Sequence, residues 1–64
     1  MSKYEESIKQ LKKKIKENPD LTREEWDTYA HENALFSAFT IASHICEEDR
    51  DYTFSELKTD VINL

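Results

Sequence analysis

The most reactive side chains in this chain are a single cysteine, Cys46, and two histidines, His31 and His44. A thiol beside an imidazole is the pair that cysteine hydrolases use as nucleophile and base. His44 and Cys46 are two positions apart on an expected helix, about 200° around its axis, so their side chains cannot meet. His31 belongs to another expected helix, and nothing in the sequence supplies an oxyanion hole. We therefore interpret Cys46 as a small core residue and the histidines as surface or rim residues, and we predict no enzyme activity.

A second group of chemically active side chains is the acidic run at residues 47–51. Glu47, Asp49 and Asp51 alternate as the ligands of a calcium loop do, but such a loop also needs a central glycine and a late glutamate. The chain contains no glycine, and Glu56 comes too early to be that glutamate. The sequence also lacks the Cys-x-x-Cys or His-x-x-x-His pairs that are typical of zinc sites. We predict no metal and no cofactor.

Charge is distributed unevenly along the chain. Residues 1–18 contain six lysines and three glutamates, a balance of +3, whereas residues 19–64 contain three basic and eleven acidic residues, a balance of −8. Together they give the net charge of −5. Such asymmetry is typical of an interaction surface, and a solvated helix face is the plainer alternative. The candidate partner-binding residues are Glu47, Glu48, Asp49, Asp51, Lys12, Lys13 and Lys16.

The elements that position these groups are expected to be helices. Tight β-hairpins favour glycine, which is absent, and Pro19 is the only proline. An apolar content of 38% with seven aromatic residues is sufficient for folding. We predict one domain over residues 1–64, an all-α fold and a small three-to-four-helix bundle with a helix-turn-helix-like centre. The expected helices span about residues 2–17, 22–32, 37–47 and 54–63.

The first two expected helices have clear local signals. A stripe with helical period runs along the first, which Ser2 caps and Asn18-Pro19 ends; its residues are Tyr4, Ile8, Leu11 and Ile15. Thr22 and Glu25 form a capping box at the start of the second helix, with Leu21 and Trp26 at the positions of a hydrophobic staple. The second helix is expected to bury Trp26, Tyr29 and Ala30.

The third expected helix follows a turn in which Asn33 adopts a left-handed conformation and Leu35 and Phe36 pack. Ser37 caps this helix. Its expected core positions are Phe39, Ala42, Ile45 and Cys46, with Ile41 alongside, and its expected exposed positions are Ser37, Ala38, Thr40, Ser43, His44 and Glu47.

The last segment offers a second Thr-x-x-Glu signal at Thr53 and Glu56. Apolar residues then recur with helical spacing, at Phe54, Leu57, Val61 and Leu64. The alternative is an extended tail, because Thr59, Val61 and Ile62 are β-branched.

Two helices joined by a short turn have the lengths of a helix-turn-helix. The second helix of that motif reads base edges with side chains such as Arg, Lys, Asn or Gln. None of the exposed positions expected on the third helix is cationic, and an acidic run follows it. We therefore expect no nucleic-acid binding by the isolated chain. The alternative is a DNA-binding module that uses the basic first helix in an oligomer.

The stretch Leu21-Thr22-Arg23-Glu24-Glu25-Trp26-Asp27-Thr28-Tyr29-Ala30, followed by Ser37-Ala38-Phe39-Thr40-Ile41, resembles the short helix-turn-helix-type repeats found beside homing endonucleases and in mobile-element proteins. The resemblance covers about twenty residues. Where that family continues with Phe-Gly-x-Trp, this chain has Ser43-His44-Ile45-Cys46. The resemblance implies a tri-helical fold with Trp26, Tyr29, Ala30 and Ile41 in the core, but it does not imply DNA binding, because the basic exposed positions are missing.

These features favour a small regulatory or accessory protein that binds another protein, through its acidic surface. A homodimer is also expected, because apolar residues left over from a small core would form a patch, namely Tyr4, Leu35, Phe36, Ile62 and Leu64. No apolar run approaches the length of a membrane span, and we expect a cytoplasmic location. The composition suits a bacterial or phage origin.

Overall fold

The computed structural model describes residues 3–45 and 52–64. This part of the chain folds into helices, without a strand: α1 (Lys3–Glu17), α2 (Arg23–Glu32), α3 (Ala38–Ile45) and α4 (Phe54–Ile62). The predicted all-α bundle is confirmed, and the last segment is a helix, not an extended tail. The Ser2 cap, the core position Cys46 and the end of the third helix at Glu47 fall outside the described residues.

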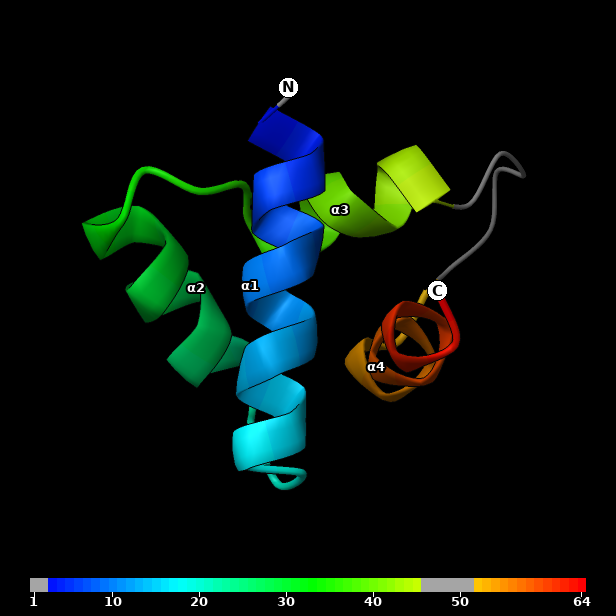
Figure 1. Ribbon diagram of the computed structural model, residues 1–64. Helices are drawn as coiled ribbons and strands as arrows, with labels where there is room; N and C mark the ends of the chain where they lie inside the picture. The colour runs from blue at the N-terminus through cyan, green and yellow to red at the C-terminus, as the bar shows by residue number, and fades with distance from the viewer. Residues whose placement is uncertain (1–2, 46–51) are drawn as a thin grey trace.

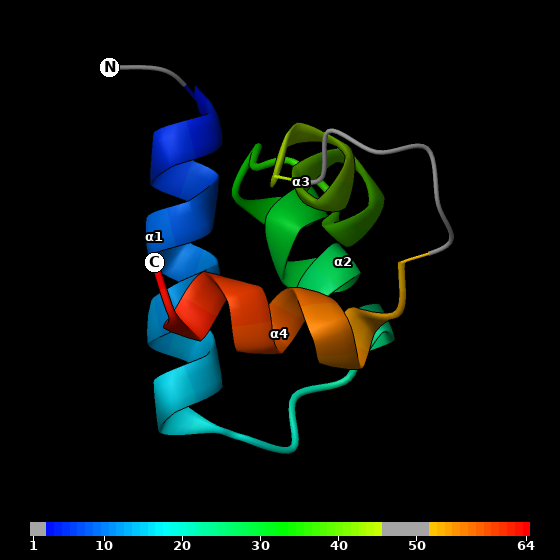
Figure 2. The same ribbon diagram turned by 90° about the vertical axis from the view of Figure 1, so that its right-hand side faces the viewer.

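The helices surround α1 on three sides. Figure 1 shows α2 and α4 on either side of α1, with α3 crossing behind it. In Figure 2 α4 runs across α1, and its C-terminal end lies beside the middle of α1. Helix α1 packs against α3 and α4, and α3 also packs against α2 and α4. The outer face of α1 is covered by no other helix in either view.

The core takes apolar side chains from all four helices. The fully buried side chains include Leu11, Trp26, Ile41 and Val61. Helices this short gain most of their stability from such packing between helices. Both residues of the expected staple, Leu21 and Trp26, are buried. The remaining members of the core cluster are Ile15, Ala30, Ala38, Ala42 and Leu57.

Three helices begin at the capping residues that the sequence predicts. Thr22 Oγ1 accepts a hydrogen bond from Glu25 N at 3.2 Å, and the Glu25 carboxylate accepts one from Thr22 N, which completes the capping box. Ser37 Oγ accepts from Thr40 N at 3.3 Å at the start of α3. Thr53 Oγ1 accepts from Glu56 N at 3.1 Å at the start of α4. These caps satisfy backbone donors that a helix N-terminus otherwise leaves free.

The predicted orientation of α3 is wrong at two neighbouring positions. Phe39 was expected in the core and is 70% exposed, whereas Ala38 was expected at the surface and is buried. Two hydrogen bonds from other helices hold the start of α3 in this rotation. Asp27 Oδ1 on α2 accepts from Ala38 N at 3.1 Å, and the buried Ser7 Oγ on α1 accepts from Phe36 N at 2.9 Å. The turn residues Leu35 and Phe36 pack against the core as expected.

The left-handed residue after α2 is Ala34, with φ of 55°, and not Asn33, whose φ is −110°. Asn33 instead donates from Nδ2 to the Tyr29 carbonyl at 2.9 Å, a bond that suits its right-handed backbone. Leu35 N donates to the Ala30 carbonyl at 2.8 Å and Ala34 N to that of His31 at 3.5 Å. This is the Schellman pattern, with alanine at the position that usually holds glycine.

Candidate functional site

The predicted lysines Lys12, Lys13 and Lys16 lie together on the outer side of α1. Lys9 belongs to the same face, since these four positions fall within about 100° around the helix axis. The face is opposite the buried residues Ser7 and Leu11. Lys9, Lys13 and Lys16 are exposed and Lys12 is half-buried. We call Lys9, Lys12, Lys13 and Lys16 the lysine face. Lys9 was not among the candidates predicted from sequence, although its spacing of four from Lys13 indicates that it belongs to this face.

Within the described residues, the four lysines of this face form no ion pair. The ion pair observed there joins Arg23 Nε to Asp27 Oδ2 at 3.5 Å. Two other lysines contact the fold directly. Lys14 Nζ lies 4.4 Å from the centroid of the Tyr29 ring, and Lys58 Nζ donates to the carbonyls of Pro19 and Leu21 at 3.1 and 3.2 Å. The lysine face is therefore the cationic surface of α1 that these contacts leave available.

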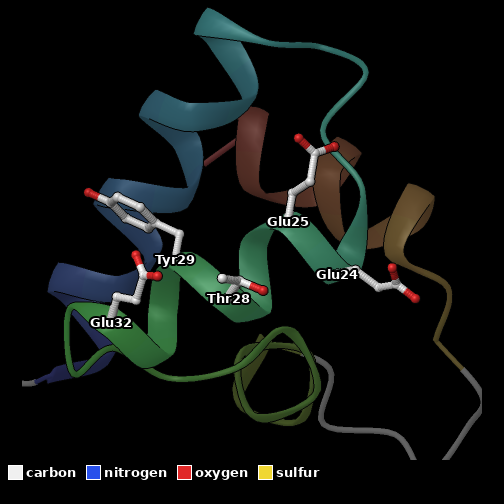
Figure 3. A pocket seen from close by; sticks show the side chains of 5 residues that line it. All are labelled: Glu24, Glu25, Thr28, Tyr29 and Glu32. Carbon is white, nitrogen blue, oxygen red and sulfur yellow. The ribbon is translucent and has the colours of Figure 1, made fainter.

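The acidic candidates Glu47, Glu48, Asp49 and Asp51 lie outside the described residues. A different acidic surface is visible on α2. Figure 3 shows Glu24, Glu25, Thr28, Tyr29 and Glu32 around an open hollow of about 440 Å³. The three carboxylates lie well apart from one another, and Tyr29 lies beside Glu32. This arrangement gives α2 an acidic surface, but the carboxylates are not placed to bind one cation together.

The described residues of α3 include no lysine or arginine that could contact nucleic acid. Its exposed side chains include Phe39, Ser43 and His44, and the Thr40 hydroxyl lies 3.1 Å from the Ser37 hydroxyl. The His44 ring stacks on Tyr4 of α1 with centroids 4.1 Å apart, and Tyr4 also stacks on Phe36 at 4.4 Å. Helix α3 thus presents an apolar and weakly polar face, which is unlike a base-reading helix.

The side chains of residues 3–45 and 52–64 that could bind a metal ion are not clustered. No group of three or more His, Asp or Glu side chains in these ranges is placed to hold a metal ion. His31 is exposed on α2, whereas His44 is engaged in the ring stack on α3. Within the same ranges, no helix has the length and apolar character needed to cross a membrane.

Comparison with known proteins adds no relative: no family model matches the chain, and neither curated proteins nor solved structures give a significant match. The resemblance to helix-turn-helix-type repeats therefore stays a prediction. Of the four residues that it implies for the core, Trp26, Ala30 and Ile41 are buried and Tyr29 is half-buried.

Proposed function

We propose that this protein is a small, non-enzymatic accessory or regulatory domain that binds another protein through the lysine face of α1. The partner presents an acidic helix or a similarly narrow acidic segment. The observation that carries this proposal is a row of four lysines along the side of α1 that no other helix covers. A cytoplasmic protein is the partner that we expect.

Charge complementarity favours an acidic partner. Lys9 and Lys16 are seven positions apart, so the lysine face extends along α1 for about 10 Å, the length of two helical turns. Carboxylates spaced by one turn on a partner helix match this row. Exposed ion pairs are individually weak, so such contacts set orientation and association rate more than they set affinity.

The flanking helices favour a narrow protein segment over a DNA duplex. Helix α2 carries Glu24, Glu25 and Glu32, and α4 carries Glu56 and Asp60, on the two sides of α1. A duplex, which is broader than a helix of about 10–12 Å, would bring its phosphates toward these carboxylates. Because α3 lies behind α1, a duplex on the lysine face would also be out of its reach.

The proposal is tested with a labelled, alanine-rich helical peptide that carries glutamates along one face. Its binding is followed by fluorescence anisotropy at about 0.05 and about 0.15 M salt, between which the Debye length falls from about 14 to about 8 Å. A peptide with glutamine at the same positions is the ligand control. Replacing three lysines, as Lys9→Gln, Lys13→Gln and Lys16→Gln, should weaken binding of the acidic peptide about tenfold, because three exposed ion pairs are lost.

A matched variant separates the lysine face from net charge. Adding glutamates at exposed positions on α2, α3 and α4, as Thr28→Glu, Ser43→Glu and Ser55→Glu, changes the net charge of −5 by −3, as the lysine variant does. This control should weaken binding less than about twofold, because charges farther away than the Debye length of about 8 Å are screened. Equal losses in both variants contradict the proposal. Tight binding of a duplex that only the lysine variant abolishes would establish the DNA-binding alternative instead.

A further inference from the structure

The lysine face has an apolar residue at the edge that lies toward α4. Tyr29 of α2 contacts Gln10 and Lys14, so these two residues mark the edge of α1 that lies toward α2. Ile8 and Lys12 are each two positions away from one of them, about 160° around the helix axis, and therefore belong to the opposite edge. Figure 1 shows α4 on that opposite side of α1. Ile8 is half-buried, so part of its side chain remains accessible beside Lys12.

The end of α4 adds further apolar surface on the same side. Ile62 is 36% exposed and Leu64 is 67% exposed, although their neighbour Val61 is buried. The chain end at Leu64 lies beside the middle of α1 in both views (Figures 1 and 2), and Ile8 and Lys12 belong to the middle turns of that helix. We call Ile8, Ile62 and Leu64 the apolar border of the lysine face.

We propose that the apolar border makes the lysine face specific for an amphipathic acidic helix, which carries one large apolar side chain next to its row of carboxylates. This specificity rests on the proposed function, in which the lysine face binds an acidic helix. Exposed ion pairs contribute little affinity, so a purely acidic segment binds weakly and with little selectivity. An apolar contact beside the lysines adds affinity only for a partner with an apolar group at the matching place.

Charge complementarity favours this occupant of the border. The four adjoining lysines form no ion pair among the described residues, so they favour an occupant that brings carboxylates together with the apolar group. A helix can present both on adjacent faces. Packed helices lie about 8–10 Å apart, a distance at which a leucine on the edge of one helix reaches side chains on the edge of the other. The other candidate occupant is a second copy, because Ile62 and Leu64 belong to the patch expected in the homodimer.

Three labelled peptides of the alanine-rich glutamate series are compared on the full chain by fluorescence anisotropy. The first has the glutamate row alone, the second adds one leucine on the edge of the row, and the third has the same leucine on the opposite face. The leucine at the edge should tighten binding about threefold to tenfold, since a partly buried leucine gains about half the free energy of complete burial. The leucine on the opposite face should give no gain. The gain should be equal at the two salt concentrations, because salt screens charges and not apolar contacts.

Replacing the apolar border, as Ile62→Ser with Leu64→Ser, should remove this gain and leave the binding of the leucine-free peptide unchanged. Phe39→Ser removes an exposed apolar residue of α3 instead, and this matched control should keep the gain.

Equal affinities of the two leucine peptides for the wild-type chain overturn the proposal. The proposed function then still stands if the leucine-free peptide binds and the lysine variant weakens it, whereas both are wrong if no glutamate peptide binds. Light scattering at the same concentrations tests the second copy. A dimer that the peptide with the leucine at its edge does not dissociate would assign the apolar border to self-association and overturn the proposal as well.

Discussion

At the scale of single residues, a few polar side chains fix the positions of the helices relative to one another. Ser7 is completely buried on α1, yet its hydroxyl has a clear purpose because it accepts from Phe36 N. Asp27 likewise joins two helices, since this α2 residue accepts a hydrogen bond from Ala38 N of α3. It also forms an ion pair with Arg23 on its own helix. Removing either side-chain acceptor would leave a partly buried backbone N–H unpaired, which costs about 1 kcal/mol or more. Such side chains act as positioning contacts between helices.

Ala34 provides a residue-scale prediction, because it holds a left-handed backbone that costs an L-residue about 1–2 kcal/mol. Ala34→Gly should raise the free energy of unfolding by about 0.5–1 kcal/mol, since glycine adopts this conformation without a steric penalty, although its unfolded chain is more flexible. Urea denaturation followed by circular dichroism measures the change.

Asn33→Gly is the matched control for this prediction. Asn33 has a negative φ and its side chain bonds to the Tyr29 carbonyl, so glycine there should lower the stability. A stabilised Asn33→Gly together with a destabilised Ala34→Gly would assign the left-handed position to Asn33, as the sequence suggested.

At the scale of elements, local sequence signals determine where α3 begins, whereas contacts with other helices determine which of its faces is buried. The helix has only eight residues, and most of them are small or apolar, so several faces are compatible with burial. Ser37 is a local signal, and the sequence correctly places it as the cap. The choice between Ala38 and Phe39 is made by acceptors on α1 and α2, which no local pattern reveals.

Phe39→Ala tests this rotation. Because Phe39 is 70% exposed, the substitution should change the free energy of unfolding by no more than about 0.5 kcal/mol. A phenylalanine in the core would cost about 3–5 kcal/mol. The buried neighbour Ile41 provides the comparison, since Ile41→Ala should cost about 2–5 kcal/mol. A large loss for Phe39→Ala in thermal or urea denaturation would show that α3 is rotated as the sequence predicted.

The candidate site divides in the same way. Helical periodicity alone is sufficient to place Lys12, Lys13 and Lys16 on one face of α1, and their role in binding a partner stays a prediction. A second hollow, of about 200 Å³ and lined by residues of α1 and α2 that include Lys14 and Tyr29, depends on the fit of these two helices, which cannot be read from spacing. Surfaces on one helix are predictable from sequence, whereas spaces between helices depend on packing.

At the scale of the whole molecule, the described exposed apolar residues are few. Of the patch expected from the sequence, Tyr4 and Phe36 are partly covered by the ring stack, whereas Ile62 and Leu64 are exposed at the end of α4. That end lies beside α1, close to the side that bears the lysine face. The homodimer stays a prediction, and Ile62 and Leu64 are the members of its expected patch that are exposed.

Light scattering near 0.1 mM tests the homodimer against the monomer mass of 7.6 kDa. We expect a mass of about twice that value, because a self-complementary apolar contact favours a two-fold dimer. Ile62→Ser with Leu64→Ser should return the mass to that of the monomer, whereas Phe39→Ser, also at an exposed apolar residue, should leave the dimer intact. A monomeric wild-type chain would leave the surface at the end of α4 without this role.

The two hydrogen bonds of Lys58 bear on the order in which the molecule assembles. They join positions 39 and 37 residues apart, farther than the 29 residues between Ser7 and Phe36. Contacts between distant residues carry a larger cost of loop closure and are slow to form. During synthesis α1, α2 and their connection are made before Lys58. Until α4 is made and packs, the side of the core that α4 covers is therefore exposed to water. Docking of α4 is the step that closes it.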